Sequence, residues 1–173
     1  RWMNGERDDV LKAMGDWVSA HPQDVRMRSV LAARLIEVGD ESAAAGHYQV
    51  LIDGGLEDPV ALNNMAWLLR EEQTDLALEY IQRADKLAPD SASIKDTYAM
   101  VELERGSFDR ALSLNQRAID AAPDSEELTL NRARILARAG RSTEARQLLE
   151  KISGSSNAQL GKEASLLLQS MTR

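Results

Sequence analysis

The feature that most constrains this chain is a spacing of about 34 residues that recurs along its length. One series of small residues has spacings of 34, 33 and 34: Ala32, Ala66, Ala99 and Ala133. A second series has spacings of 34, 33, 34 and 34: Val10, Ala44, Ala77, Ala111 and Ala145. Both series have the same period, and both contain one interval that is a residue shorter. This pattern predicts a linear array of equal units that stack on each other, instead of separate globules.

Residues 92–125 show how one unit folds. Its first apolar stripe has helical spacing and comprises Ile94, Tyr98 and Val101. Its second stripe comprises Ala111, Leu114 and Ala118. Gly106 separates the two stripes and Pro123 follows the second, so the unit is predicted to be two antiparallel helices joined by a tight turn. The small Ala99 and Ala111 stand where the two helices would cross, and a larger side chain there would push the backbones apart.

The turn residues follow the same period. The predicted turn glycines are Gly5, Gly39, Gly106 and Gly140, and the prolines after second helices are Pro22, Pro89 and Pro123. The single shortening falls in the turn at residues 71–74, which also lacks the glycine. These series divide the chain into a half repeat at 1–24, repeats at 25–58, 59–91, 92–125 and 126–157, and a closing amphipathic helix at 158–173.

The two ends are expected to differ. The chain starts with Arg1 inside a repeat, which favours a fragment of a longer array, whereas the closing helix would cover the last apolar surface of a solenoid. Trp17 stands where later repeats have Ala84 and Ala118, which indicates either end packing or an interface at an exposed edge.

Composition excludes several classes of function. The formal net charge of −7 argues against a general nucleic-acid binder, because phosphate contacts need clustered Lys and Arg. The sequence has no apolar run of membrane-spanning length and no signal peptide, so direct membrane insertion of this segment is not expected. The absence of cysteine is compatible with either the cytoplasm or a bacterial periplasm.

No catalytic constellation is recognisable. The two histidines, His21 and His47, lie in different repeats near helix ends and are expected to be solvated. Adjacent acids such as Glu71 and Glu72 diverge by roughly 100° on a helix and cannot form a catalytic pair. We therefore expect no enzyme activity, no metal and no cofactor.

The period, the small residues at both crossings, the turn glycine and the terminal proline together resemble the tetratricopeptide repeat family. The resemblance covers essentially the whole chain and implies an all-α solenoid, a right-handed superhelix whose first helices line a concave groove. Residues 58–69, 77–80 and 86–90 also resemble the C-terminal repeats of long bacterial tetratricopeptide lipoproteins of exopolysaccharide and PEP-CTERM systems. That resemblance favours a periplasmic or cell-envelope location, with the cytoplasm as the alternative.

Helical phase places a set of side chains on the implied groove: Arg26, Ser29, Asn63, Trp67, Arg70, Asp96, Met100, Asn131, Arg134 and Arg138. Trp67 could anchor a partner peptide or pack on a neighbouring helix. Asn63 and Asn131 could hydrogen-bond an extended backbone, because an amide offers a donor and an acceptor. Only Asn131, Arg134 and Arg138 match part of the terminal-carboxylate site of chaperone adaptors, and a lysine partner is lacking.

Two core positions depart from the family pattern. Glu102 and Arg132 stand where aliphatic or aromatic residues are usual, so we expect both to be exposed or paired, and burial of either would contradict the assigned phase. Charge is also uneven, because residues 37–58 contain six acids and no Lys or Arg whereas residues 132–151 are mainly basic. Such a dipolar array could orient a charged partner or favour self-association at low salt.

The function that these features favour is a scaffold that binds a partner peptide or protein of unknown identity in the concave groove, in a bacterial envelope or exopolysaccharide system. The alternatives are a direct binding module for an acidic polysaccharide, using Trp67, Arg134 and Arg138, and a regulatory domain of a larger enzyme. The low aromatic content of 4% counts against the polysaccharide alternative.

Overall fold

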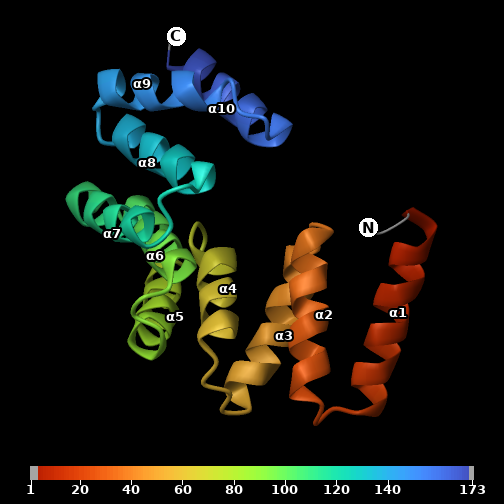
Figure 1. Cartoon of the computed structure of the whole chain (residues 1–173). Helices are drawn as coiled ribbons and strands as arrows, with labels where there is room; N and C mark the ends of the chain where they lie inside the picture. Colours follow the sequence, from red (N-terminus) through yellow and green to blue (C-terminus); the bar gives the residue numbers. More distant parts are fainter. Residues whose placement is uncertain (1–3, 172–173) are drawn as a thin grey trace.

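The computed structural model describes residues 4–171. Within this range the chain forms ten α-helices and no strand (Figure 1). The helices are α1 Asn4–Ala20, α2 Val25–Glu37, α3 Glu41–Asp53, α4 Pro59–Leu69, α5 Thr74–Leu87, α6 Ala92–Glu104, α7 Phe108–Ala121, α8 Glu126–Arg138, α9 Ser142–Ile152 and α10 Ala158–Ser170. Helices α2–α3, α4–α5, α6–α7 and α8–α9 form the four predicted hairpins, and the hairpins stack along a curved path. The prediction of an all-α solenoid is confirmed.

The start of each first helix has a chemical cause. A side-chain oxygen of the residue before α2, α4, α6, α8 and α10 accepts a hydrogen bond from a backbone N–H of the first turn: Asp24, Asp58, Ser91, Ser125 and Asn157. Among the second helices, α3 is capped in the same way by Asp40, whereas α5, α7 and α9 have no side-chain cap. Helix α10 takes the place of a first helix because it packs on α8 and α9 as α8 packs on α6 and α7.

The small residues at the crossings are fully buried, as the repeat predicts. The exposed fraction is 0% for Ala32, Ala44, Ala66, Ala77, Ala99, Ala111, Ala133 and Ala145. Three of the predicted turn glycines, Gly39, Gly106 and Gly140, have φ between 74° and 83°, a conformation that a side chain disfavours. The assignment of Gly5 as a fourth turn glycine is wrong, because Gly5 lies within α1 and no helix precedes it in the described residues.

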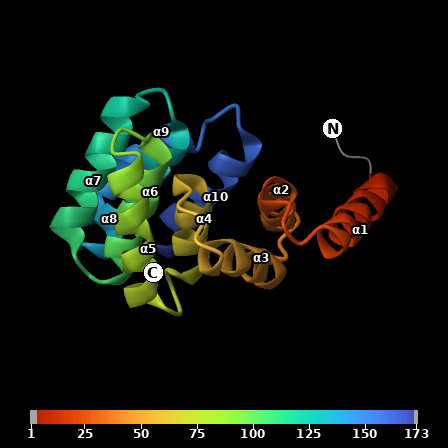
Figure 2. The same ribbon diagram turned by 90° about the horizontal axis from the view of Figure 1, so that it is seen from below.

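Helix α1 departs from the other second helices. Val10 has the crossing position of α1 but is 40% exposed, and Trp17 is 47% exposed. Trp17 stacks on His21 with ring centroids 4.0 Å apart, and its indole N–H donates to Asp24 at 3.0 Å. Viewed from below, α1–α3 extend away from the closely packed helices α4–α10 (Figure 2). Val10 is thus not a buried crossing residue, because no helix within residues 4–171 covers it.

The structure corrects the expectation that burial of Glu102 would contradict the helical phase assigned to α6. It is 0% exposed, yet it pairs with Arg105 and Arg110, each at 3.0 Å. The Arg105 pair is a hydrogen bond, whereas the Arg110 N–H does not point at its oxygen, Oε1. The phase of α6 is nevertheless correct, because α4, α5, α7 and α8 enclose this helix and leave little exposed face. Arg132 is half-buried and donates to the Asn115 side chain at 3.4 Å.

Helix α10 packs its apolar side chains on α8 and α9. Leu160 and Ala164 of α10 are buried with Leu130 and Leu149, while Lys162 and Gln169 remain exposed. Among residues 4–171, no helix combines the length and the apolar character needed to cross a membrane.

Candidate interaction groove

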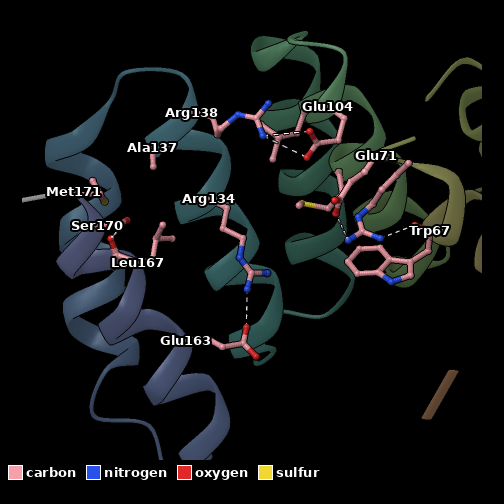
Figure 3. A pocket seen from close by; sticks show the side chains of 13 residues that line it. Trp67, Glu71, Glu104, Arg134, Ala137, Arg138, Glu163, Leu167, Ser170 and Met171 are labelled. Carbon is pink, nitrogen blue, oxygen red and sulfur yellow. Dashed lines mark hydrogen bonds and ion pairs between the residues drawn. The ribbon is translucent and has the colours of Figure 1, made fainter. Parts of the chain in front are cut away.

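The first helices α4, α6, α8 and α10 form a continuous row, and their inner faces enclose a groove with a volume of about 660 Å³ (Figure 3). We call this the interaction groove and define it by its lining residues. They are Trp67, Arg70, Glu71, Met100, Leu103, Glu104, Arg134, Ala137, Arg138, Glu163, Leu167, Ser170 and Met171. Trp67, Met100 and Arg134 are separated by 33 and 34 residues, so the repeat itself places one side chain per unit in the groove.

The base of the groove is apolar. Met100 and Leu103 are 6% and 2% exposed, and Leu167 and Met171 line it from α10. Ala137 is the smallest of the lining side chains and faces Leu167 across the groove in Figure 3. A preformed depression that combines an apolar base with polar groups around it is typical of ligand and peptide sites.

Trp67 is held by its own repeat. The Arg70 guanidinium lies over the indole ring, 3.8 Å from its centroid. Arg70 also donates to the Trp67 carbonyl oxygen and to Glu71, each at 2.6 Å. The ring is therefore fixed in orientation before any partner binds, which lowers the entropic cost of using it as an anchor.

Two ion pairs join neighbouring first helices at the groove (Figure 3). Arg134 of α8 donates to Glu163 of α10 at 2.6 Å, and Arg138 of α8 donates to Glu104 of α6 at 3.2 Å. The side chain of Arg138 is 51% exposed whereas that of Glu104 is 22% exposed. Since these pairs are partly exposed, we expect each to contribute no more than about 1 kcal/mol to stability.

A polar network lies behind Arg134. Arg134 donates to the Asn131 side-chain oxygen at 2.7 Å, and Asn131 donates to Asp96 at 2.6 Å. Asn115 of α7 donates to the same carboxylate at 3.4 Å. Burial raises the pKa of Asp96 to about 6, although the hydrogen bonds from Asn131 and Asn115 and the charge of Arg134 oppose the increase.

A smaller depression of about 350 Å³ lies beside the interaction groove. Trp67, Arg134 and Glu163 line both spaces, so the Arg134–Glu163 pair separates them. Asn131, Asn157 and Gln159 give the smaller space a more polar lining. The two spaces together offer an apolar and a polar compartment to a ligand.

The structure brings together five of the ten predicted groove residues: Trp67, Arg70, Met100, Arg134 and Arg138. Asn131 lines the smaller depression, but both ends of its amide already have partners. Asn63 and Asp96 line neither space. Arg26 and Ser29 lie on α2, which does not pack on α4 as α4 packs on α6, so the groove does not extend to them. A role in partner binding stays a prediction for all ten.

Eight of the thirteen lining residues were not among the ten predicted ones: Glu71, Leu103, Glu104, Ala137, Glu163, Leu167, Ser170 and Met171. Glu104 could have been predicted from the sequence, because it is one period before the predicted Arg138. Glu163, Leu167 and Ser170 belong to α10 and Met171 follows it, and this helix was interpreted only as a closing helix. The order of the helices was the signal, because α10 follows the second helix α9 and so takes the place of a first helix.

The remaining polar groups do not form a catalytic or metal site within residues 4–171. No group of three or more His, Asp or Glu residues in this range could hold a metal ion. His21 is exposed as expected, whereas His47 is half-buried, and burial followed by the nearby Arg28 lowers its pKa. The absence of enzyme activity stays a prediction.

Comparisons with known proteins agree with this architecture. The tetratricopeptide repeat family model matches residues 102–159. The solved structure of TTC0263, a thermophilic tetratricopeptide repeat protein of Thermus thermophilus, is 18% identical with a TM-score of 0.75, covering 97% of this chain and 91% of that chain. A tetratricopeptide repeat protein from Parabacteroides merdae is 19% identical with a TM-score of 0.76, covering 98% of this chain and 74% of that chain.

A third solved structure, YrrB, is described as a tetratricopeptide repeat protein with an unusual peptide-binding site. It is 19% identical with a TM-score of 0.67, and the match covers 93% of this chain and 84% of that chain. No curated protein sequence matches this chain. The chain therefore has the fold of tetratricopeptide-repeat solenoids, and residues 102–159 also match the family model.

Proposed function

We propose that this chain is a scaffold that binds a segment of a partner protein in the interaction groove. The observation that carries the proposal is the preformed apolar groove between α4, α6, α8 and α10, with a fixed Trp67 and three arginines around it. The rigid stack supplies the site ready-made, so most of the ordering cost falls on the partner segment. The peptide-binding site ascribed to YrrB supports a peptide as the type of ligand.

The cellular context is a second part of the proposal. We propose a bacterial envelope or exopolysaccharide assembly or export system, with a periplasmic location. Support comes from the sequence of residues 58–69 and 86–90, which resembles repeats of lipoproteins in such systems.

The test is site-specific photocrosslinking in cells of the source organism. A photoreactive residue in place of Ser170, which is exposed and lines the groove, is expected to crosslink one protein. The same residue in place of Gln116, exposed on α7, is the matched control. The crosslink should be lost when Trp67→Ala is added, because removal of an aromatic anchor commonly weakens binding more than tenfold. A crosslink of equal yield at both positions would contradict the groove as the binding site, and a partner outside the envelope would contradict the context.

The polysaccharide alternative has weaker support. Trp67 is the only aromatic ring that lines the groove in the described part of the chain, and Arg70 covers one of its faces. Calorimetric titration with alginate, an acidic polysaccharide, is expected to show no binding. Binding that disappears in both Trp67→Ala and Arg134→Ala would support this alternative instead.

A further inference from the structure

We propose that the interaction groove selects a partner segment in which a large apolar side chain lies close to an acidic side chain, and that Arg138 binds the acidic group. The inference rests on the proposed function and adds the chemistry of the partner. It follows from three properties of the groove, which are the hydrogen bonding of its carboxylates, the free edge of Arg138 and the apolar surface beside it.

The two carboxylates between the groove helices already have partners within the chain. Both oxygens of Glu104 accept from Nη1 of Arg138, at 3.4 and 3.2 Å. Glu163 accepts from Arg134 at one oxygen and from Gln159 at the other, at 2.6 and 3.3 Å. The third carboxylate, Glu71, pairs with Arg70 and is 65% exposed, so it faces mainly solvent. Because each groove carboxylate is paired with an arginine, a lysine or arginine of a partner would also meet that arginine's positive charge.

Arg138 differs from the other groove cations. Arg70 is held by the Trp67 carbonyl and Glu71, and Arg134 is held by Asn131 and Glu163. Arg138 uses only Nη1, and its Nε and Nη2 have no hydrogen-bond partner within residues 4–171. The Nε–Nη2 edge of a guanidinium matches the two oxygens of a carboxylate, so Arg138 offers an open bidentate site on a half-exposed side chain.

An apolar surface lies directly beside that edge. Ala137 precedes Arg138 in sequence, and Leu103, Leu167 and Met171 line the same groove. The small Ala137 leaves room for a partner side chain that the neighbouring lining residues would contact. A segment that places a large apolar side chain there brings an acid a few residues away within reach of Arg138.

The acid need not be a chain terminus. A terminal-carboxylate site would use Asn131 as a donor, but Asn131 already donates to Asp96 and accepts from Arg134. The available donors belong to one arginine and suit a side-chain carboxylate equally well. Blocked peptides should therefore bind as tightly as peptides with a free carboxyl end.

The test is a selection from a displayed library of short random peptides on the whole chain, followed by calorimetry with acetylated and amidated peptides. The enriched peptides should share a large apolar residue with Asp or Glu close by. Arg138→Gln should weaken their binding about tenfold, the usual size of one charge-assisted contact. Glu104→Gln should strengthen binding severalfold, because it removes a negative charge beside Arg138 that would repel the acidic group of the partner. Arg117→Gln, the same change on the exposed surface of α7, should have no effect.

Opposite effects of Arg138→Gln and Glu104→Gln on affinity would show that Arg138 contacts the partner and does not only hold the helices together. If Arg138 only held the helices together, Glu104→Gln would weaken binding as much as Arg138→Gln, and that result would overturn the inference. Peptides that need Trp67 but lack an acid, or that bind only with a free carboxyl end, would also overturn it and leave the proposed function intact. A selection that yields no peptide bound in the groove would contradict both.

Discussion

Helices α1 and α7 occupy equivalent places in their repeats but have different surroundings. Val10 and Trp17 of α1 are 40% and 47% exposed, whereas their counterparts in α7, Ala111 and Ala118, are both 0% exposed. The positions are the same in the repeat, so burial in a solenoid depends on which neighbours are present as well as on the sequence pattern. An apolar residue on α1 is then a surface feature, while the same position in α7 is part of the core.

A similar difference separates α2 from α6. Helix α6 buries nine residues because helices enclose it on most sides, whereas α2 buries only Leu31 and Ala32. The turn before α4 also differs from the corresponding later turns. It has two glycines, Gly54 and Gly55, in place of the usual Ala-Pro, and Gly55 has a φ of 85°. The groove begins at α4, so the proposed binding surface lies in the C-terminal part of the array.

The largest effect is expected from paired substitutions at equivalent positions of α3 and α1. Leu51 is 3% exposed and stands 34 residues after Trp17. Leu51→Ala should lower the free energy of unfolding by about 3 kcal/mol, through lost burial and a cavity, while Trp17→Ala should cost less than about 1 kcal/mol. Urea unfolding followed by circular dichroism measures both, with the exposed Val50→Ala as a control. Equal costs at the two positions would show that α1 is covered in solution.

A smaller effect is expected at Glu102, the polar residue in a series otherwise made of leucine. One period apart, the series reads Leu35, Leu69, Glu102 and Leu136. Glu102→Ala should cost about 2 kcal/mol, because it leaves a cavity and removes the partner of Arg105 and Arg110. Both arginines are partly exposed and can be solvated, so Glu102→Leu should be at least as stable as the wild type. Thermal unfolding of the two variants tests this, and a large loss with Leu would show that the ion pairs stabilise α6.

These comparisons also show what the sequence could predict. Small residues, turn glycines and apolar stripes depend on local geometry that repeats, so the helices and the row of first helices followed from spacing alone. The spacing also placed Trp67, Met100 and Arg134 in one groove. It could not show that Glu102 is buried and paired, because the partner Arg110 lies on the next helix and pairing depends on side-chain conformation.

The polar network around Asp96 could not be predicted from the sequence for the same reason. Asp96 and Asn63 have equivalent positions, 33 residues apart, and phase placed both on the groove. In the structure Asp96 accepts from two asparagines of α7 and α8. Asn63 instead donates to Asn64 at 3.4 Å, and its own side-chain oxygen is buried without a partner. One position thus has two environments, set by residues on other helices.

The smallest effect is expected from the pH dependence of Asp96. Burial raises its pKa in the folded chain to about 6, above the ordinary value of 3.8. Between these values the folded state holds a proton that the unfolded state has lost, so this group's contribution to stability decreases as pH rises from about 4 to about 6. Asp96→Asn removes that contribution and should flatten this part of the profile. The difference in urea midpoint, wild type minus variant, should fall over this range and stay constant above pH 7.

Asp124→Asn is the matched control, because Asp124 is exposed in the turn before α8 and its removal leaves the network intact. Only Asp96→Asn should make the difference in urea midpoint depend on pH. The other carboxylates are the same in the wild type and the variant, so their effects cancel in the difference. A difference that increases with pH would mean that the hydrogen bonds from Asn115 and Asn131 outweigh burial and stabilise the charged form of Asp96. In that case the junction of α6, α7 and α8 would be held by a charged carboxylate, and Arg134 would be positioned for the groove by charge as well as by hydrogen bonding.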